Sequence, residues 1–173
     1  MKRYILISAL GCLCLSTPGQ SRAQPEPEPE GSVYVIPVKG QIERGLLYAF
    51  RRGLKEAKAN EAKAVILDMD TPGGTLASAE EMMLLLLDAE MPTYTFVNPR
   101  AISAGAMIAM ATDEIIMTPT ALIGDAMPIM MSPVPMGGAQ EIPDGLREKI
   151  LSPTLALMRS AAQEKGHDPE IGI

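Results

Sequence analysis

Side chains that commonly carry catalysis or bind metals are scarce in this 173-residue chain. The only histidine is His167, the only cysteines are Cys12 and Cys14, and tryptophan is absent. A Ser-His-Asp triad would have to use His167, and a cysteine nucleophile would have to come from the extreme N-terminal stretch. A zinc site built from His and Cys ligands cannot be assembled. Lysine is therefore the base that this composition leaves available, and we expect neither a metal nor an organic cofactor.

Aromatic side chains and positive charge are also in short supply. The chain has two Phe and four Tyr, and setting aside Lys2, Arg3 and Arg22 leaves 12 basic against 21 acidic residues, a net charge of −9. No basic patch with interleaved aromatic residues occurs, so we expect no nucleic-acid partner. The 47% apolar and 21% charged content is typical of one packed globular domain.

The N-terminus has the pattern of a secretory signal. Two basic residues precede an apolar stretch at residues 4–15, and small residues flank Arg22 at the two positions that a signal peptidase reads. We therefore predict a signal peptide over residues 1–23 and export to the periplasm or another extracytoplasmic space. An uncleaved membrane anchor is the alternative, although the apolar segment is shorter than the roughly 20 residues of a spanning helix.

Residues 24–30 alternate proline with glutamate and predict a short extended tether. The folded domain is expected to occupy residues 31–173, and it contains no cysteine that could form a disulfide.

Within this domain, strand patterns alternate with helix patterns. Residues 63–69 form a continuous apolar run, which is typical of a parallel strand buried on both faces, and Pro37 suits an edge strand. The alternation predicts right-handed βαβ units, and hence an α/β fold with a mostly parallel sheet flanked by helices. The expected strands are 32–38, 63–69, 93–97 and 114–117, and the expected helices are 44–59, 76–89, 103–111 and 146–166.

A long segment rich in Pro, Gly, Met and Ser interrupts this alternation at residues 124–145. Such a segment without periodicity is either a functional lid or poorly ordered. Its methionines could offer an adaptable apolar surface to a peptide.

Two breaks in the strand pattern point to chemistry. The run 65–70 ends in Thr-Pro-Gly-Gly at residues 71–74, where backbone N–H groups stand free of side chains. The next strand leads to Ala-Ile-Ser-Ala-Gly at residues 101–105, which places the hydroxyl of Ser103 where a loop turns into an apolar helix. Together these segments predict an oxyanion hole and a serine nucleophile.

With these segments, the domain resembles the NfeD-type membrane-bound serine proteases of the ClpP class, which have the ClpP/crotonase fold of repeated β-α units. The resemblance rests on four segments in this order: 70–74 (Asp-Thr-Pro-Gly-Gly), 103–105 (Ser-Ala-Gly), 123–128 (Ile-Gly-Asp-Ala-Met-Pro), and 148–150 (Glu-Lys-Ile) ahead of 159–162 (Arg-Ser-Ala-Ala). The family continues through a further strand and helix, so we expect residues 31–173 to be truncated at the C-terminal side.

The resemblance implies a serine endopeptidase with a Ser-Lys dyad. Ser103 would be the nucleophile and Lys149 the general base, while Gly74 and Ala104 would supply the oxyanion-hole N–H groups and Gly73 would hold the turn. It also implies substrates that are apolar segments of membrane-associated, stomatin-type proteins, and a homo-oligomer as the active unit.

A lysine can act as such a base only when it is neutral. With an ordinary pKa of about 10.4, only about one lysine in a thousand is neutral near pH 7.4. The pKa of a useful base must fall by roughly three units, about 4 kcal/mol, which requires a dry apolar pocket.

Other interpretations remain open. Ser103 could simply cap a helix, and Lys39 and Lys165 compete with Lys149 as the base. Asp68 and Asp70 could be an acid–base pair, although a structural role at the end of a strand is favoured. The rival functions are a signal-peptide-peptidase-like protease, a crotonase-type acyl-CoA enzyme, for which no carboxylate base or CoA pocket is evident, and a peptide-binding module of the same fold that does not cleave.

Overall fold

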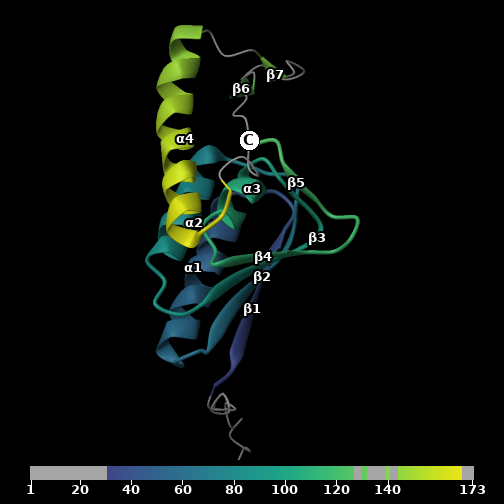
Figure 1. The fold of residues 1–173 in the computed structure, drawn as a ribbon, viewed down its shortest axis with the longest axis vertical. Helices are drawn as coiled ribbons and strands as arrows, with labels where there is room; N and C mark the ends of the chain where they lie inside the picture. The colour runs from purple at the N-terminus through teal and green to yellow at the C-terminus, as the bar shows by residue number, and fades with distance from the viewer. Residues whose placement is uncertain (1–30, 127–129, 132–138, 141–143, 169–173) are drawn as a thin grey trace, which may run out of the picture.

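The computed structural model describes residues 31–126, 130–131, 139–140 and 144–168, in which strands and helices alternate along the chain (Figure 1). The predicted signal peptide, the tether and most of the Met-rich segment lie outside the described residues. The elements are β1 (Val33–Lys39), α1 (Arg44–Ala59), β2 (Ala64–Thr71), α2 (Leu76–Leu87), β3 (Thr93–Ile102), α3 (Ala104–Ala109), β4 (Glu114–Met117), β5 (Leu122–Gly124), β6 (Met130–Met131), β7 (Ala139–Gln140) and α4 (Asp144–Lys165).

The main sheet has five parallel strands, which confirms the predicted α/β fold. Its order is β1-β2-β3-β4, and Pro37 lies on the edge strand β1 as expected. Strand β3 is longer than predicted because its first half pairs with β4 and its second half pairs with β5, which the sequence pattern did not reveal. The carboxyl ends of parallel strands meet at one edge of a sheet, which is where such folds place their sites.

The helices cover one face of this sheet in Figure 1. On β2, the side chains of Val65, Leu67 and Met69 are fully buried, whereas the residues between them are only half-buried. The expectation that this strand is buried on both faces is therefore wrong for the described residues. Continuous hydrophobicity along a strand does not by itself show that helices cover both sides.

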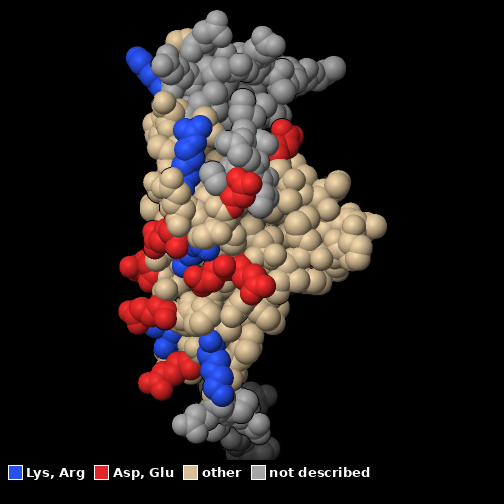
Figure 2. Space-filling model, viewed as in Figure 1, with Lys and Arg blue, Asp and Glu red and all other residues tan. Residues whose placement is uncertain are grey.

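The core lies between the sheet and helices α1 and α2. Four side chains of these helices are fully buried: Phe50 of α1, and Met82, Met83 and Leu86 of α2. Burying each such side chain stabilises the fold by about 1.5–3 kcal/mol. Charged residues gather over the helices, while the flank formed by β3 to β5 shows almost no charge on the face seen in Figure 2.

Helix α4 is docked through its C-terminal half. Met158, Ala161 and Ala162 are buried, and the hydroxyl of Thr154 donates a hydrogen bond of 3.2 Å to Glu80. Pro153 lies inside this helix. Because proline has no N–H, it cannot bond the carbonyl group four residues earlier, and its ring favours a kink there.

A polar cluster fixes the C-terminal end of α4 to the sheet. Lys165 donates to Asp113 at 2.8 Å, and Asp113 accepts hydrogen bonds from the N–H and the hydroxyl of Thr93. His167 is half-buried, and its Nε2 lies 2.6 Å from the carbonyl oxygen of Thr112. A carbonyl can only accept, so this ring nitrogen carries the proton.

In the segment expected to lack regular structure, β6 and β7 form one short antiparallel pair.

Candidate active site

The first wall of the site is the turn that follows β2. Thr71 is fully buried; its hydroxyl donates to the carbonyl of Gly40 at 2.6 Å and accepts from the N–H of Gly73 at 3.0 Å. On the other side of the turn, the N–H of Ile42 bonds the carbonyl of Gly73 at 2.9 Å, and the N–H of Thr75 bonds Ile42 at 2.8 Å. These bonds join the β2–α2 turn to the loop before α1.

Ser103 forms the second wall, at the sharp turn from β3 into α3. Its backbone has φ 54° and ψ −119°, a conformation that is strained for a residue with a side chain, and its N–H donates to the carbonyl of Gly124 at 2.9 Å. The hydroxyl makes no capping bond to the helix. A strained turn from strand to helix is also how the α/β-hydrolase nucleophile is presented. Pairing of β3 with β5 brings Gly124 to this turn.

The two walls touch each other. Gly73 has φ +107°, and a Cβ added there would lie 2.7 Å from Cβ of Ser103. A Cβ added at Gly105 would lie 2.5 Å from the Cγ2 methyl of Thr71. Glycine at both positions lets the Ser103 turn approach the Gly-Gly turn without a collision.

Both turns open into a cavity of about 460 Å³. Among the described residues, the N–H groups of Gly74 and Ala104 have no hydrogen-bond acceptor, whereas the N–H of Gly73 is taken by Thr71. The cavity is lined by Gln41, Glu43, Pro72, Gly73, Gly74, Thr75, Leu76, Ser103, Ala104, Met107 and Ala126. It therefore contains the predicted nucleophile and all three residues of the predicted oxyanion hole.

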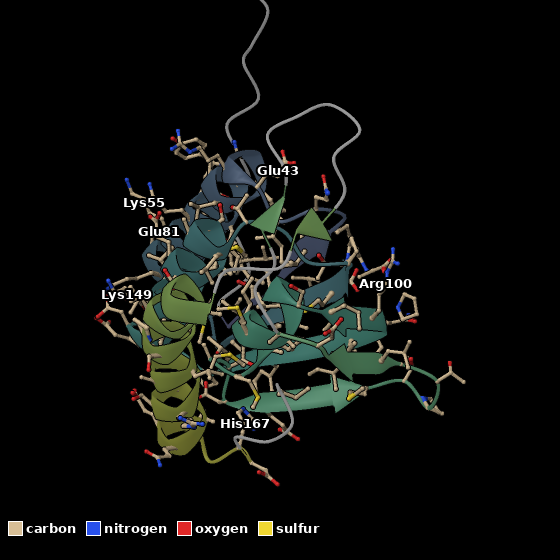
Figure 3. All side chains as sticks on the ribbon, turned by 90° about the horizontal axis from the view of Figure 1, so that it is seen from above. Glu43, Lys55, Glu81, Arg100, Lys149 and His167 are labelled. Carbon is tan, nitrogen blue, oxygen red and sulfur yellow. The ribbon has the colours of Figure 1, made fainter. Side chains whose placement is uncertain are left out.

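Lys149 is not among the residues that line this cavity. It is exposed on α4, before Pro153, and lies at the outer edge of the molecule in Figure 3. The two competing lysines are held elsewhere: Lys39 bonds Asp68 at 2.6 Å, and Lys165 bonds Asp113 at 2.8 Å. Neither of these lysines is among the residues that line the cavity.

The other titratable candidates also have structural partners. Asp68 pairs with Lys39, and Asp70 pairs with Arg100 at 3.0 Å, in agreement with the favoured structural role. His167 lies at the opposite end of the molecule from Glu43 (Figure 3). Among the described residues of the cavity wall, Glu43 is the one acidic or basic side chain. A triad of Ser103 with His167 is therefore not assembled.

Three residues of the site and its surroundings were not predicted from the sequence: Thr71, Gln41 and Glu43. Thr71 stands in the predicted motif, and a threonine placed directly before a Pro-Gly-Gly turn is the signal that could have identified it. Gln41 and Glu43 belong to the loop after β1, and only the pairing of β1 with β2 brings them to the cavity.

In the part of the chain that the structure describes, no three His, Cys, Asp or Glu side chains are grouped in a way that could hold a metal ion. None of the helices in that part has both the length and the hydrophobicity to cross a bilayer.

Comparison with known families gives a match over most of the chain. The sequence model of the family described as "NfeD1b, N-terminal domain" matches residues 32–173. Membrane protein NfeD1b of Bacillus subtilis is 38% identical over 169 residues, which is 95% of this chain and 35% of that protein. Membrane-bound protease PH1510 of Pyrococcus horikoshii is 30% identical over 172 residues, 98% of this chain and 36% of that protein. The chain thus spans about a third of the length of these relatives.

Solved structures of a protease domain have the same fold. A lysine-to-alanine variant of the 1510-N membrane-bound stomatin-specific protease, in complex with a substrate peptide, superposes with a TM-score of 0.72 and 31% identity, covering 83% of this chain and 65% of the other. A serine-to-alanine variant of the same protease gives a TM-score of 0.71 and 31% identity, covering 82% and 68%.

Proposed function

This chain belongs to the NfeD1b N-terminal domain family, and we propose that it is the catalytic domain of a serine endopeptidase with Ser103 as its nucleophile. The observation that carries this proposal is the hydroxyl of Ser103 on a strained turn, in one cavity with the N–H groups of Gly74 and Ala104, which have no acceptor among the described residues. The relatedness to a protease with a bound substrate peptide supports it.

The proposed reaction is acyl transfer to serine. The Ser103 oxygen attacks the peptide carbonyl while its proton passes to the neutral amine of Lys149. The N–H groups of Gly74 and Ala104 stabilise the negative oxygen that develops, and one such donor typically contributes about 2.7–4 kcal/mol. Lys149 then returns the proton to the leaving amine, and a water molecule hydrolyses the acyl-enzyme by the reverse sequence of proton transfers.

Lys149 must reach Ser103 for this dyad to form. Two routes are compatible with its exposed position: the segment of α4 before Pro153 bends toward the cavity, or α4 of a second copy enters it. We propose a homo-oligomer as the active unit, because burial of Lys149 against another copy would also supply the dry surroundings that lower the pKa of a lysine.

The cavity wall favours an apolar side chain of the substrate. Its described lining includes one carboxylate, that of Glu43, and four apolar residues: Pro72, Leu76, Met107 and Ala126. We therefore propose that the substrates are apolar segments of membrane-associated, stomatin-type proteins, and that the domain acts outside the cytoplasm near a membrane. The specificity stated for the 1510-N protease is consistent with this substrate class.

The position of Lys149 outside the cavity favours a second candidate function. Without a base near Ser103, the same cavity would hold an apolar peptide and not cleave it. This binding module would bind a fluorescent apolar peptide in an anisotropy titration but would show no covalent chemistry at Ser103.

Labelling of the purified chain with a fluorophosphonate probe separates the two functions. For the protease, the wild-type chain is labelled, Ser103→Ala is not, and Ser78→Ala is labelled normally. Ser78 is a suitable control because it is buried beside the cavity residue Thr75, whose hydroxyl donates to it at 2.8 Å. Equal labelling of wild type and Ser103→Ala would eliminate Ser103 as the nucleophile, and an unlabelled wild type that binds peptide would support the binding module.

A further inference from the structure

We propose that Thr71 is the positioning residue of the oxyanion hole: its buried hydroxyl fixes the Gly73–Gly74 peptide so that the N–H of Gly74 is directed into the cavity. The inference rests on the proposed function, because it concerns how the same site is built. Thr71 itself is absent from the cavity wall and acts only through the backbone.

The direction of the hydrogen bonds at Thr71 follows from its partners. Two carbonyl oxygens, which can only accept, lie near the single hydroxyl proton: that of Gly40 at 2.6 Å and that of Gly73 at 3.4 Å. The much shorter distance assigns the proton to Gly40. The lone pairs of the same oxygen are then free for the N–H of Gly73, at 3.0 Å. The hydroxyl therefore donates to the loop after β1 and accepts from the turn after β2.

These bonds decide which N–H groups are available to a substrate. The turn has two successive backbone N–H groups. The N–H of Gly73 donates to the hydroxyl of Thr71, whereas the N–H of Gly74 has no acceptor among the described residues. The carbonyl of Gly73 is held by the N–H of Ile42 at 2.9 Å, and this carbonyl belongs to the same peptide unit as the N–H of Gly74. A planar peptide fixed at its carbonyl and at the preceding amide has its N–H direction fixed as well.

Thr71 also lies close to the second wall. A Cβ added at Gly105 would be 2.5 Å from its Cγ2 methyl, so the start of α3 packs near this side chain. The hydroxyl bond to Gly40 connects the turn to the loop that carries Gln41 and Glu43 into the cavity. One buried side chain thus contacts three segments of the site.

Two substitutions separate the hydroxyl from the shape of the side chain. Thr71→Val keeps the shape but loses both hydrogen bonds, whereas Thr71→Ser keeps the hydroxyl and loses the methyl. Thr95→Val is the matched control, because Thr95 is equally buried and, among the described residues, its hydroxyl bonds that of Thr112, at 3.0 Å. Neither threonine lines the cavity. Thermal melting of all three variants confirms that they are folded before kinetics are measured.

The measurement is the reaction of each chain with a fluorophosphonate, resolved into a maximal inactivation rate and a half-saturating concentration. Removing one oxyanion donor typically lowers a rate by about 10²–10³. If loss of the Thr71 hydroxyl turns the N–H of Gly74 away from the substrate, Thr71→Val should lower the maximal rate by about 10–100-fold. Its half-saturating concentration should stay within about threefold of the wild-type value. Thr71→Ser and Thr95→Val should both stay within about threefold of wild type in rate.

A merely structural role gives a different pattern. The inference is overturned if a folded Thr71→Val chain reacts at the wild-type rate, or if Thr95→Val loses as much rate as Thr71→Val for the same loss of melting temperature. It is also overturned if Thr71→Ser fails to restore the rate. The proposed function fails separately, when wild-type labelling is absent or survives Ser103→Ala.

Discussion

The two ends of strand β3 differ in whether their hydroxyl and N–H groups have hydrogen-bond partners. At the start of the strand, the hydroxyl and the N–H of Thr93 both donate to one oxygen of Asp113, at 2.9 and 2.7 Å, and Lys165 binds the other oxygen at 2.8 Å. At the end of the strand, the hydroxyl of Ser103 makes no capping bond and the N–H of Ala104 has no acceptor in the described part of the chain.

The difference shows how stability and binding capacity are divided within one fold. Buried polar groups that are fully paired stabilise the structure, whereas groups left without a partner cost free energy until a ligand supplies one. The start of β3 therefore fastens α4 to the sheet. The end of β3 keeps its donors open, and the strained backbone of Ser103 persists because Gly124 and the Gly-Gly turn hold it.

The largest expected effect concerns Lys149 and the end of β3 at Ser103, where the N–H donors lack partners among the described residues. If Lys149 is the base, Lys149→Ala lowers the rate of fluorophosphonate labelling by about 10²–10⁴-fold at neutral pH, because general-base catalysis contributes that much. Lys39→Ala is the control: this lysine is exposed and paired with Asp68, and its loss should leave the rate within about twofold. A rate near that of wild type in Lys149→Ala would assign the base to another group.

The same variants decide which copy supplies the lysine. If α4 of a second copy enters the cavity, a mixture of Ser103→Ala and Lys149→Ala chains regains labelling, because some sites then contain an intact serine and an intact lysine. If the lysine comes from its own chain, the mixture stays as slow as Lys149→Ala alone.

A substitution at the start of β3, where Thr93, Asp113 and Lys165 are paired, should change stability and leave activity unchanged. Asp113→Asn removes the ion pair with Lys165, and since Asp113 is 42% exposed we expect a loss of about 1–2 kcal/mol, after allowing for solvent screening. Thermal or urea unfolding measures the loss, while the labelling rate per folded molecule should match wild type. A strong loss of labelling at full stability would mean that the two ends are coupled.

The stability difference between wild type and Asp113→Asn should depend on pH. Burial alone would raise the pKa of Asp113, but the hydrogen bonds from Lys165 and Thr93 outweigh it and lower the pKa below its ordinary value of 3.8. A carboxyl group whose pKa is lowered in the folded state stabilises the protein above its unfolded pKa, and this contribution disappears as the pH falls through the folded value. The difference should thus be complete near pH 7 and shrink below about pH 4.

The smallest expected effect concerns the strain at Ser103. Glycine adopts the positive φ of this residue without strain, whereas alanine does not, and the relief of about 1–3 kcal/mol is reduced by the greater freedom of glycine in the unfolded chain. We expect Ser103→Gly to unfold with a free energy about 0.5–1 kcal/mol higher than Ser103→Ala, with neither variant labelled. Equal stabilities would mean that the strain is no larger than the entropic cost of glycine, about 0.4–1 kcal/mol.

The local pattern of the sequence predicted most of the elements. Helix α1 and strand β4 have the predicted bounds, because apolar spacing and turn residues are local signals. The Gly-Gly turn and Ser103 were also predicted from short segments of sequence, since small residues that follow an apolar strand pattern can be recognised without knowledge of the fold. The sequence did not show that β5 completes the edge of β3, because three residues carry too little periodicity to specify a pairing partner.

What the sequence alone determined is the set of groups available for chemistry: one serine beside a glycine turn, no cysteine in the predicted domain and a single remote histidine. Only the tertiary structure decided which groups meet. Strand pairing placed the Ser103 turn against Gly73, brought Glu43 into the cavity wall and buried Thr71 where its hydroxyl binds both loops, while it left Lys149 exposed. These outcomes depend on contacts between segments far apart in the chain, and residue types and spacing do not encode such contacts locally.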